Sequence, residues 1–262
     1  MGAALRKAGE SCNRLVASST LTARIYFRLL PYLSPWFGQK TQQRLRNSIN
    51  SVNWPQISLR YRRVTLGNET EVVLYPHFQE FDLEALLSRR LHYEQEVFAF
   101  LETQMPKYQS VIEIGANVGV FSVFFSRWLA RHAPLGKVFA FEPSRRAYAR
   151  LLQNLELNAS TNVMAFNCAV GRDSGFSSFF EPDGHLTNGS LDAAFARQFS
   201  PASKAAPVLV VKGGLIENLI GAEDPVLLKL DVEGAEAQVL RSLEGFIRSR
   251  QWSGCCLVPK RS

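Results

Sequence analysis

The chain has 262 residues, of which 46% are hydrophobic and 20% are charged, a composition typical of globular proteins. It excludes a wholly disordered chain, a collagen-like fibre and a coiled coil, and no stretch reaches the roughly 18 uncharged apolar residues that span a bilayer. The cysteines form neither a disulfide framework nor a zinc-binding spacing, which favours a reducing compartment, cytoplasmic or organellar; they are Cys12, Cys168, Cys255 and Cys256.

The net charge of +7 is unevenly distributed along the chain. Residues 1–68 contain eleven Lys or Arg and a single acid, Glu10, whereas residues 69–262 contain nineteen bases and twenty-two acids. A nucleic-acid-binding protein is expected to spread its basic residues over a folded face. Because the basic excess is confined to one end, nucleic-acid binding is not expected.

Residues 1–55 are predicted to form a basic helical tract. Arginines alternate with apolar residues there, and no Asp or Glu occurs between Ser11 and Asn68. This pattern fits three interpretations, which stay open at this point. The tract is a solvated helix that precedes the domain, an organellar transit peptide, or a helix that contacts an anionic membrane surface through residues 1–46.

Residues 56–262 are predicted to form the main domain, with a hairpin and a helix over 56–109 and a ligand-binding core over 110–262. Alternating residues 57–61 indicate a strand that continues to Leu66. The turn pair Gly67-Asn68 leads into a returning strand over 71–75. Apolar residues at steps of three and four predict a helix over 82–104.

The core begins with a buried strand, a glycine turn over 115–119 and a buried helix. Strands and helices then alternate, which indicates an α/β fold with a Rossmann-like, doubly wound and mostly parallel sheet. The predicted strands are 111–114, 138–141, 163–170 and 226–230, and the predicted helices are 121–129, 144–158 and 235–243. Residues 181–207, rich in Gly, Ser, Ala and Pro, are predicted to be a loop.

Ligands of such sheets bind beyond the carboxyl ends of the strands. Four residues with polar or reactive side chains lie at or near these ends, namely Glu113, Glu142, Cys168 and Asp231. We therefore expect a ligand-binding edge there, with the glycine turn at its centre.

Two cofactors compete for this edge. A dinucleotide needs a second glycine two residues after the first, so that the backbone can approach the pyrophosphate, but Asn117 occupies that position after Gly115. A carboxylate such as Glu113 beside the turn repels a pyrophosphate and attracts a cation. S-adenosylmethionine lacks phosphate and carries an ammonium and a sulfonium, so it fits better than NAD. Glu142 is suited to accept hydrogen bonds from both ribose hydroxyls of either cofactor.

Around these residues the chain resembles the FkbM-type methyltransferases, which are S-adenosylmethionine-dependent enzymes of the class I fold. The resemblance covers roughly residues 57–250 and is most specific in the run Lys229-Leu-Asp-Val-Glu-Gly-Ala-Glu236. The other matching segments are Tyr93-Glu94, Val111–Ser122, Val138–Ser144 and Asn154–Asn158. The resemblance implies methyl transfer, commonly to a hydroxyl of a sugar, glycan, lipid or natural product.

The predicted cofactor-binding residues are Glu113, Gly115, Asn117, Gly119, Glu142, Cys168 and Asp231. A hydroxyl acceptor also needs a general base, and Asp231 is the best-placed candidate. Glu233 is a second carboxylate nearby. No metal site is expected, because this pair has no third ligand close by in the sequence.

The chain departs from the family pattern at two places. The family usually carries Ser/Thr-Leu-Asp before a short helix near position 214, whereas this chain reads Lys212-Gly-Gly-Leu-Ile-Glu217, so the aspartate expected there is missing. The few residues after 250 provide one further strand, Cys255–Val258, and no antiparallel pair, which predicts truncated C-terminal strands. These departures keep a cofactor-binding protein without catalytic activity as an alternative, and a NAD-dependent oxidoreductase as a weaker one.

Overall fold

The computed structural model describes residues 2–182, 189–198, 202–220, 225–232, 234–249 and 255–257. It divides the chain into two compact units, Met1–Gln95 and Glu96–Ser262. The sequence places the division after residue 55 instead. In the structure the hairpin and the segment that follows it belong to the same unit as the N-terminal helices.

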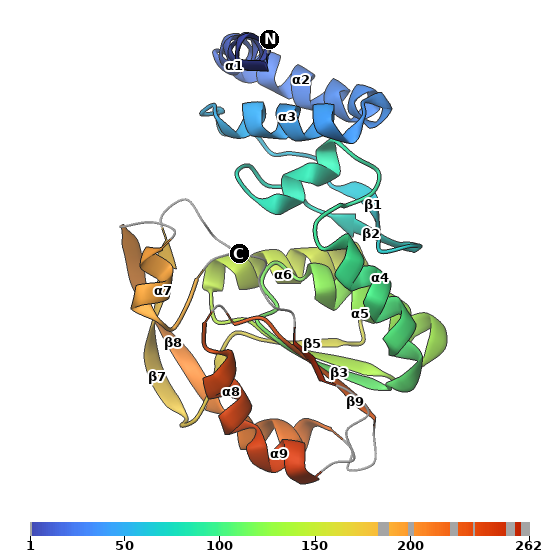
Figure 1. The fold of residues 1–262 in the computed structure, drawn as a ribbon, viewed down its shortest axis with the longest axis vertical. Helices are drawn as coiled ribbons and strands as arrows, with labels where there is room; N and C mark the ends of the chain where they lie inside the picture. Colours follow the sequence, from blue (N-terminus) through green and yellow to red (C-terminus); the bar gives the residue numbers. More distant parts are fainter. Residues whose placement is uncertain are drawn as a thin grey trace. The chain divides into compact units, whose positions relative to one another are not determined.

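The N-terminal unit begins with three helices, α1 (Gly2–Ala17), α2 (Thr20–Leu33) and α3 (Gln39–Asn50), with the 3-10 helix η1 (Ser34–Trp36) between the last two (Figure 1). The Ser19 side chain accepts a hydrogen bond from the Leu21 N–H and caps α2, as small polar residues do at helix starts. Phe27 and Leu30 on one face of α2 are buried in an apolar cluster with Ile49 of α3. The helical prediction for this tract is thus confirmed.

A hairpin follows, but it is shorter than predicted. Its strands β1 (Arg62–Leu66) and β2 (Thr70–Leu74) pair antiparallel around Gly67, whose φ is 56°. The strand prediction for residues 57–61 is wrong: Leu59 is buried and Ile57 packs against the apolar cluster, so these side chains serve the core without a pairing strand.

The prediction of one helix over 82–104 is also wrong. The structure has the 3-10 helix η2 (Phe81–Leu86), an extended segment and then α4 (Gln95–Gln104). The Thr65 N–H of β1 donates to the Arg89 carbonyl, and the Leu91 N–H donates to the Thr65 carbonyl. Pairing with β1 thus draws residues 89–91 out of any helix.

The C-terminal unit is built on a parallel sheet with the strand order β10-β9-β3-β4-β5 among the described residues. The strands are β3 (Ser110–Ile114), β4 (Lys137–Phe141), β5 (Val163–Phe166), β9 (Val226–Leu230) and β10 (Cys255–Leu257). The principal helices are α5 (Val120–His132), α6 (Arg145–Leu157), α8 (Glu236–Ser242) and α9 (Glu244–Ser249) (Figure 1). The predicted α/β fold with a parallel sheet is confirmed, and β10 is the strand predicted at 255–258, of which Val258 lies outside the described residues.

The two faces of the sheet carry different side chains, because successive residues of a strand point to opposite sides. One face is an apolar core that also takes in Val239, Leu243 and Phe246 from α8, α9 and their junction; its strand members include Ile112, Ile114, Phe139, Phe141, Leu228 and Leu230. The other face meets α5, and it is the face on which Glu113 and Lys229 lie.

Two further sequence predictions need correction. The predicted third strand breaks after Phe166, and β6 (Ala169–Gly171) joins a separate sheet with β7 (Gly175–Pro182) and β8 (Ser203–Lys212), in the order β6-β8-β7. Residues 181–207 are therefore not one loop, since they contain the end of β7, helix α7 (Ala193–Arg197) and the start of β8. Strand β8 pairs antiparallel with the whole of β7. The amino-acid composition of residues 181–207 does not indicate this pairing.

Short 3-10 helices, η3 (Met105–Lys107) and η5 (Gly213–Leu219), complete the described elements. None of the helices within the described ranges is both long and apolar enough to cross a membrane. Glu233, the second carboxylate near Asp231 in the sequence, lies outside the described residues.

Candidate functional site

The carboxyl ends of β3 and β9 form the point at which the direction of the sheet's connections reverses. From β3 the chain runs through α5 to β4 and on to β5, whereas β9 and β10 lie on the other side of β3. Ligands of doubly wound sheets bind at such a point. The Asp231 N–H donates to the Ile114 carbonyl at 3.0 Å, so the ends of the two strands are held together there.

Both predicted glycines of the turn adopt positive φ angles, 85° at Gly115 and 82° at Gly119, where L side chains are strained. A Cβ at Gly115 would lie 1.9 Å from the Asp231 carbonyl oxygen, and one at Gly119 would lie 2.3 Å from Leu151 Cδ1 of α6. The missing side chains therefore let the turn pack against β9 and α6. Any contact of these glycines with a cofactor is left to their backbone.

Glu142, the residue after β4, reaches back to the glycine turn. Its carboxylate accepts hydrogen bonds from the Asn117 N–H at 2.7 Å and from the Ser144 N–H at 2.8 Å. Asn117 has a positive φ of 53°, and the bond to Glu142 fixes its backbone. Glu142 is 5% exposed. The structure thus brings Glu142 and the predicted turn residues together.

Glu113 lies deeper than the sequence suggests. Its side chain is fully buried and accepts a hydrogen bond from Ser122 of α5 at 2.5 Å. Lys229, its register partner on β9, places its ammonium 3.7 Å from Glu113 and 3.5 Å from Asp231. The same ammonium lies 4.4 Å from the centre of the Phe121 ring. The negative charge of Glu113 is therefore offset within the protein.

Asp231 is the more accessible carboxylate of this cluster. Its side chain is 26% exposed, whereas those of Glu113 and Lys229 are buried. If both carboxylates are ionised, the three charges sum to one negative charge, and Asp231 presents it to solvent. This arrangement makes Asp231, rather than Glu113, the group that a cationic ligand would meet.

Burial dominates the protonation of the two buried acids. It raises the pKa of Glu113 to about 7, against the opposing effects of Lys229 and the Ser122 hydroxyl. It likewise raises the pKa of Glu142 to about 7, although the Ser144 and Asn117 N–H groups favour the carboxylate. Charge repulsion from Glu113 also raises the pKa of Glu142, as a smaller contribution.

Cys168 follows β5 and is 4% exposed, and it belongs to the apolar core with Phe141 and Val170. Burial raises the pKa of its thiol to about 11, so the thiol stays protonated at neutral pH. Its side chain serves packing, and any contact with a cofactor would come from its backbone.

Three residues of the site carry no assigned role in the sequence analysis. Lys229 and Ser122 stand in segments that resemble the family, but the sequence assigns neither a contact, whereas in the structure both contact the Glu113 carboxylate. Asn167 donates from Nδ2 to the Glu142 carbonyl at 2.8 Å and to the Pro143 carbonyl at 3.1 Å. A lysine inside an otherwise apolar strand was the signal that could have identified Lys229, because buried charges require a partner.

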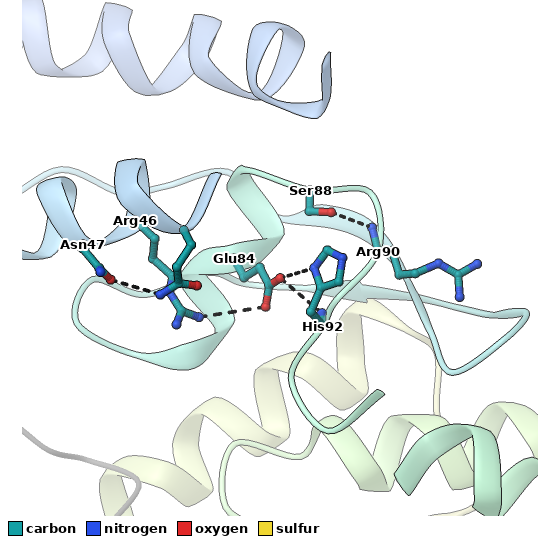
Figure 2. A network of polar contacts seen from close by, with 7 residues as sticks. Arg46, Asn47, Glu84, Ser88, Arg90 and His92 are labelled. Carbon is teal, nitrogen blue, oxygen red and sulfur yellow. Dashed lines mark hydrogen bonds and ion pairs between the residues drawn. The ribbon is translucent and has the colours of Figure 1, made fainter. Parts of the chain in front are cut away.

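A second polar cluster lies within the N-terminal unit (Figure 2). Glu84 accepts hydrogen bonds from the His92 N–H at 3.2 Å and pairs with His92 Nδ1 at 2.5 Å, while Arg46 lies 3.9 Å from its other oxygen. The cluster borders a cavity of about 440 Å³; amides and two aromatic rings line it, among them Gln39, Gln42, Asn47, Asn50, Phe81 and Tyr93. His92 is therefore held in a polar network with Glu84 and Arg46.

The parallel sheet and its flanking helices define a Rossmann-like α/β protein, and the glycine turn 115–119 lies at the carboxyl end of β3, where folds of this class bind their ligands. The model of the methyltransferase FkbM domain matches residues 113–255, more than half of the chain. The chain belongs to the FkbM methyltransferase family, as its sequence motifs predicted.

Curated relatives match over part of their length. "Methyltransferase 1" of Beauveria bassiana is 27% identical in a match that covers 53% of this chain and 60% of the relative. "Methyltransferase sdnD" of Sordaria araneosa is 28% identical in a match that covers 53% of this chain and 62% of the relative. "Hexuronic acid methyltransferase AglP" of Haloferax volcanii is 26% identical in a match that covers 62% of this chain and 61% of the relative. The chain spans about six tenths of the length of these relatives.

Two solved structures resemble the chain weakly. A methyltransferase FkbM from Methylobacillus flagellatus has a TM-score of 0.34 at 16% identity, covering 56% of this chain and 32% of its own. A precorrin-6y C5,15-methyltransferase from Geobacter metallireducens has a TM-score of 0.35 at 17% identity, and the match covers 62% of this chain and 60% of that protein.

Proposed function

We propose that the chain binds S-adenosylmethionine at the turn 115–119 and transfers its methyl group to a hydroxyl oxygen. The observation that carries this proposal is the position of two acids beside one tight backbone turn: Glu142 accepts from the Asn117 N–H, and the accessible Asp231 lies against Gly115. Acidic side chains disfavour the phosphates of a dinucleotide and suit a ligand with positive charge. Membership of the FkbM family supports methyl transfer over the nicotinamide-dependent alternative.

The residues present fit the cofactor in two places. Glu142 lies at the end of β4 with both carboxylate oxygens fixed by backbone N–H groups, and each oxygen retains a lone pair that suits a ribose hydroxyl. Asp231 offers the accessible negative charge that suits the cationic methionine end. When bound, the cofactor supplies an electrophilic methyl group, so the chain's own residues have to align donor and acceptor and remove a proton.

A calorimetric titration with S-adenosylhomocysteine tests the cofactor. We expect the wild type to bind, and Glu142→Gln to bind about tenfold more weakly or worse, because it loses charge-assisted hydrogen bonds. Glu244→Gln is the matched control, since Glu244 is an exposed acid on α9 that pairs with Arg248. The proposal would be overturned if the wild type did not bind S-adenosylhomocysteine, or if it bound NAD more tightly than S-adenosylhomocysteine.

We also propose Asp231 as the general base for the acceptor hydroxyl, since it is the most exposed acid of the charge cluster. The acceptor class is a sugar, glycan, lipid or natural product; the hexuronic acid named for the Haloferax volcanii relative makes uronic acids a first choice of substrate. In assays of methyl incorporation, Asp231→Asn should lower turnover about a hundredfold or more.

The same variant separates a base from a group that only holds the cofactor. A base predicts that S-adenosylhomocysteine affinity falls far less than turnover in Asp231→Asn. If affinity for S-adenosylhomocysteine and turnover fell by the same factor, Asp231 would serve cofactor binding alone.

Cofactor binding without catalysis stays the second candidate, because Gly213 and Gly214 stand where the family usually carries Leu-Asp. The structure gives a packing reason for one glycine there: a Cβ at Gly213 would lie 2.6 Å from the Ser242 carbonyl oxygen. Methyl transfer to any hydroxylated acceptor by the wild type would exclude this candidate.

A further inference from the structure

The outer face of α2 carries apolar side chains that the fold does not use. Leu21 is 67% exposed, Ile25 48% and Leu29 54%, and they recur at steps of four on one side of the helix. The opposite side, with Ala23, Phe27 and Leu30, already fills the core of the N-terminal unit. Leu21, Ile25 and Leu29 are therefore not needed to pack α2 against the rest of the N-terminal unit.

Further exposed apolar residues lie in the last turn of α2, in η1 and the residue after it, and at the end of α1. Tyr32 is 70% exposed, Leu33 60%, Trp36 83% and Phe37 44%, and Leu15 of α1 is 74% exposed. We call this set, with Leu21, Ile25 and Leu29, the apolar stripe. Single exposed apolar residues are normal, but a contiguous group of this kind marks an interaction site.

The charged residues of α2 are all basic. Arg24 and Arg28 are exposed on α2 and lie one residue before Ile25 and Leu29, so they flank the stripe along the helix. Arg14 of α1 and Lys40 and Arg44 of α3 are also exposed. No acid occurs from Ser11 to Asn68 to neutralise them. The partner must therefore bring negative charge together with an apolar surface.

We propose that the apolar stripe docks the protein onto an anionic membrane surface, with α2 lying in the interface and its arginines among the headgroups. Helices that bind this way combine Leu and Trp on one face with Lys or Arg beside it. Tyr and Trp side chains suit the headgroup region, because each has an apolar ring and a polar tip.

Two other occupants fit less well. A second copy of the chain would bring two rows of arginines together, which costs energy by like-charge repulsion. Nucleic acid would satisfy the arginines but would leave Leu21, Ile25 and Leu29 in water.

Vesicle co-sedimentation of the full chain tests the proposal. We expect binding to phosphatidylcholine vesicles that contain about 30% phosphatidylserine, weak binding to phosphatidylcholine alone, and release by salt. Arg24→Gln/Arg28→Gln should weaken binding about tenfold or more, and Leu21→Gln/Leu29→Gln should do so by a similar factor.

Matched controls come from the C-terminal unit. Leu135 is 95% exposed and Phe176 82%, so Leu135→Gln/Phe176→Gln removes comparable apolar surface elsewhere. Arg131→Gln/Arg172→Gln does the same for two exposed arginines. Both control variants should bind vesicles as the wild type does. Brominated lipid chains should also quench tryptophan emission in the wild type and much less in Trp36→Phe.

Four outcomes would overturn the proposal. Two come from the vesicle assay: the protein shows no preference for phosphatidylserine vesicles, or the stripe variants bind as the controls do. The third is a protein that binds no vesicles but forms a dimer in sedimentation velocity, which Leu21→Gln/Leu29→Gln dissociates. The fourth is a protein that binds duplex DNA or RNA more tightly than vesicles, with an affinity for the nucleic acid that Leu21→Gln/Leu29→Gln leaves unchanged.

Discussion

Lys229 determines the charge of the candidate site at the scale of single residues. It is buried beside Glu113 and Asp231 and above the Phe121 ring. A buried charge without its partner is costly, whereas removing both partners together can be nearly neutral. Glu113 therefore depends on Lys229 more than the sequence, which places both simply on strands, would suggest.

Lys229→Met should destabilise the protein by about 3–5 kcal/mol near pH 8, because it leaves Glu113 buried as an uncompensated anion. The loss should be smaller near pH 6, since the pKa of Glu113 is about 7 even with Lys229 in place and the acid can protonate. Urea unfolding at both pH values measures this.

The double variant Lys229→Met/Glu113→Gln is the matched control for that prediction. It removes both charges, so it should recover most of the lost stability. If the double variant were as unstable as Lys229→Met alone, the ammonium would act through packing on Phe121 rather than through Glu113.

The glycine turn is the feature that matters most at the scale of elements. Its two positive-φ glycines meet different neighbours, a backbone carbonyl at Gly115 and the end of a leucine side chain at Gly119. A backbone atom can move only if β9 moves with it, whereas a side chain can change rotamer. The two positions should therefore tolerate substitution differently.

Gly115→Ala should cost more stability than Gly119→Ala, and both should cost more than about 1 kcal/mol because of the positive φ. Gly214→Ala is the control, since a Cβ there has no neighbour within 4 Å and no positive φ is recorded; it should be close to neutral. Thermal unfolding of the three variants ranks them. Equal losses at Gly115 and Gly119 would mean that contact with Asp231 relaxes easily.

Element prediction succeeded where local pattern and packing agree. The strands at 111–114, 138–141 and 226–230 are fully apolar or nearly so and match β3, β4 and β9. It failed where a distant partner decides the backbone: residues 89–91 pair with β1, and residues 169–171 pair with β8. Neither partner is recognisable from the local sequence.

The whole molecule should lose stability as pH rises through the neutral range. The pKa values of Glu113 and Glu142 are raised from 4.5 to about 7 in the folded state, so between these values the native protein holds more protons than the unfolded chain. Stability from these groups is then present below about pH 4.5 and is lost by about pH 7. Urea unfolding from about pH 5 to about pH 8 measures the slope.

Glu142→Gln should flatten that slope, because it removes one of the two groups, even though it lowers stability overall by weakening the bonds to Asn117 and Ser144. Glu244→Gln should keep the wild-type slope. A Glu142→Gln protein with an unchanged slope would show that Glu142 does not take up a proton on folding.

The sequence by itself determined the family, the α/β class and the positions of the acids around the turn, because these depend on short-range patterns: a buried strand, a glycine turn, a helix, and an acid after the next strand. Only the tertiary structure decided what the acids do. It buried Glu113 against Lys229, tied Glu142 to the turn and left Asp231 accessible, since pairing across parallel strands joins residues more than a hundred positions apart. It likewise decided which face of α2 fills the core and which remains exposed.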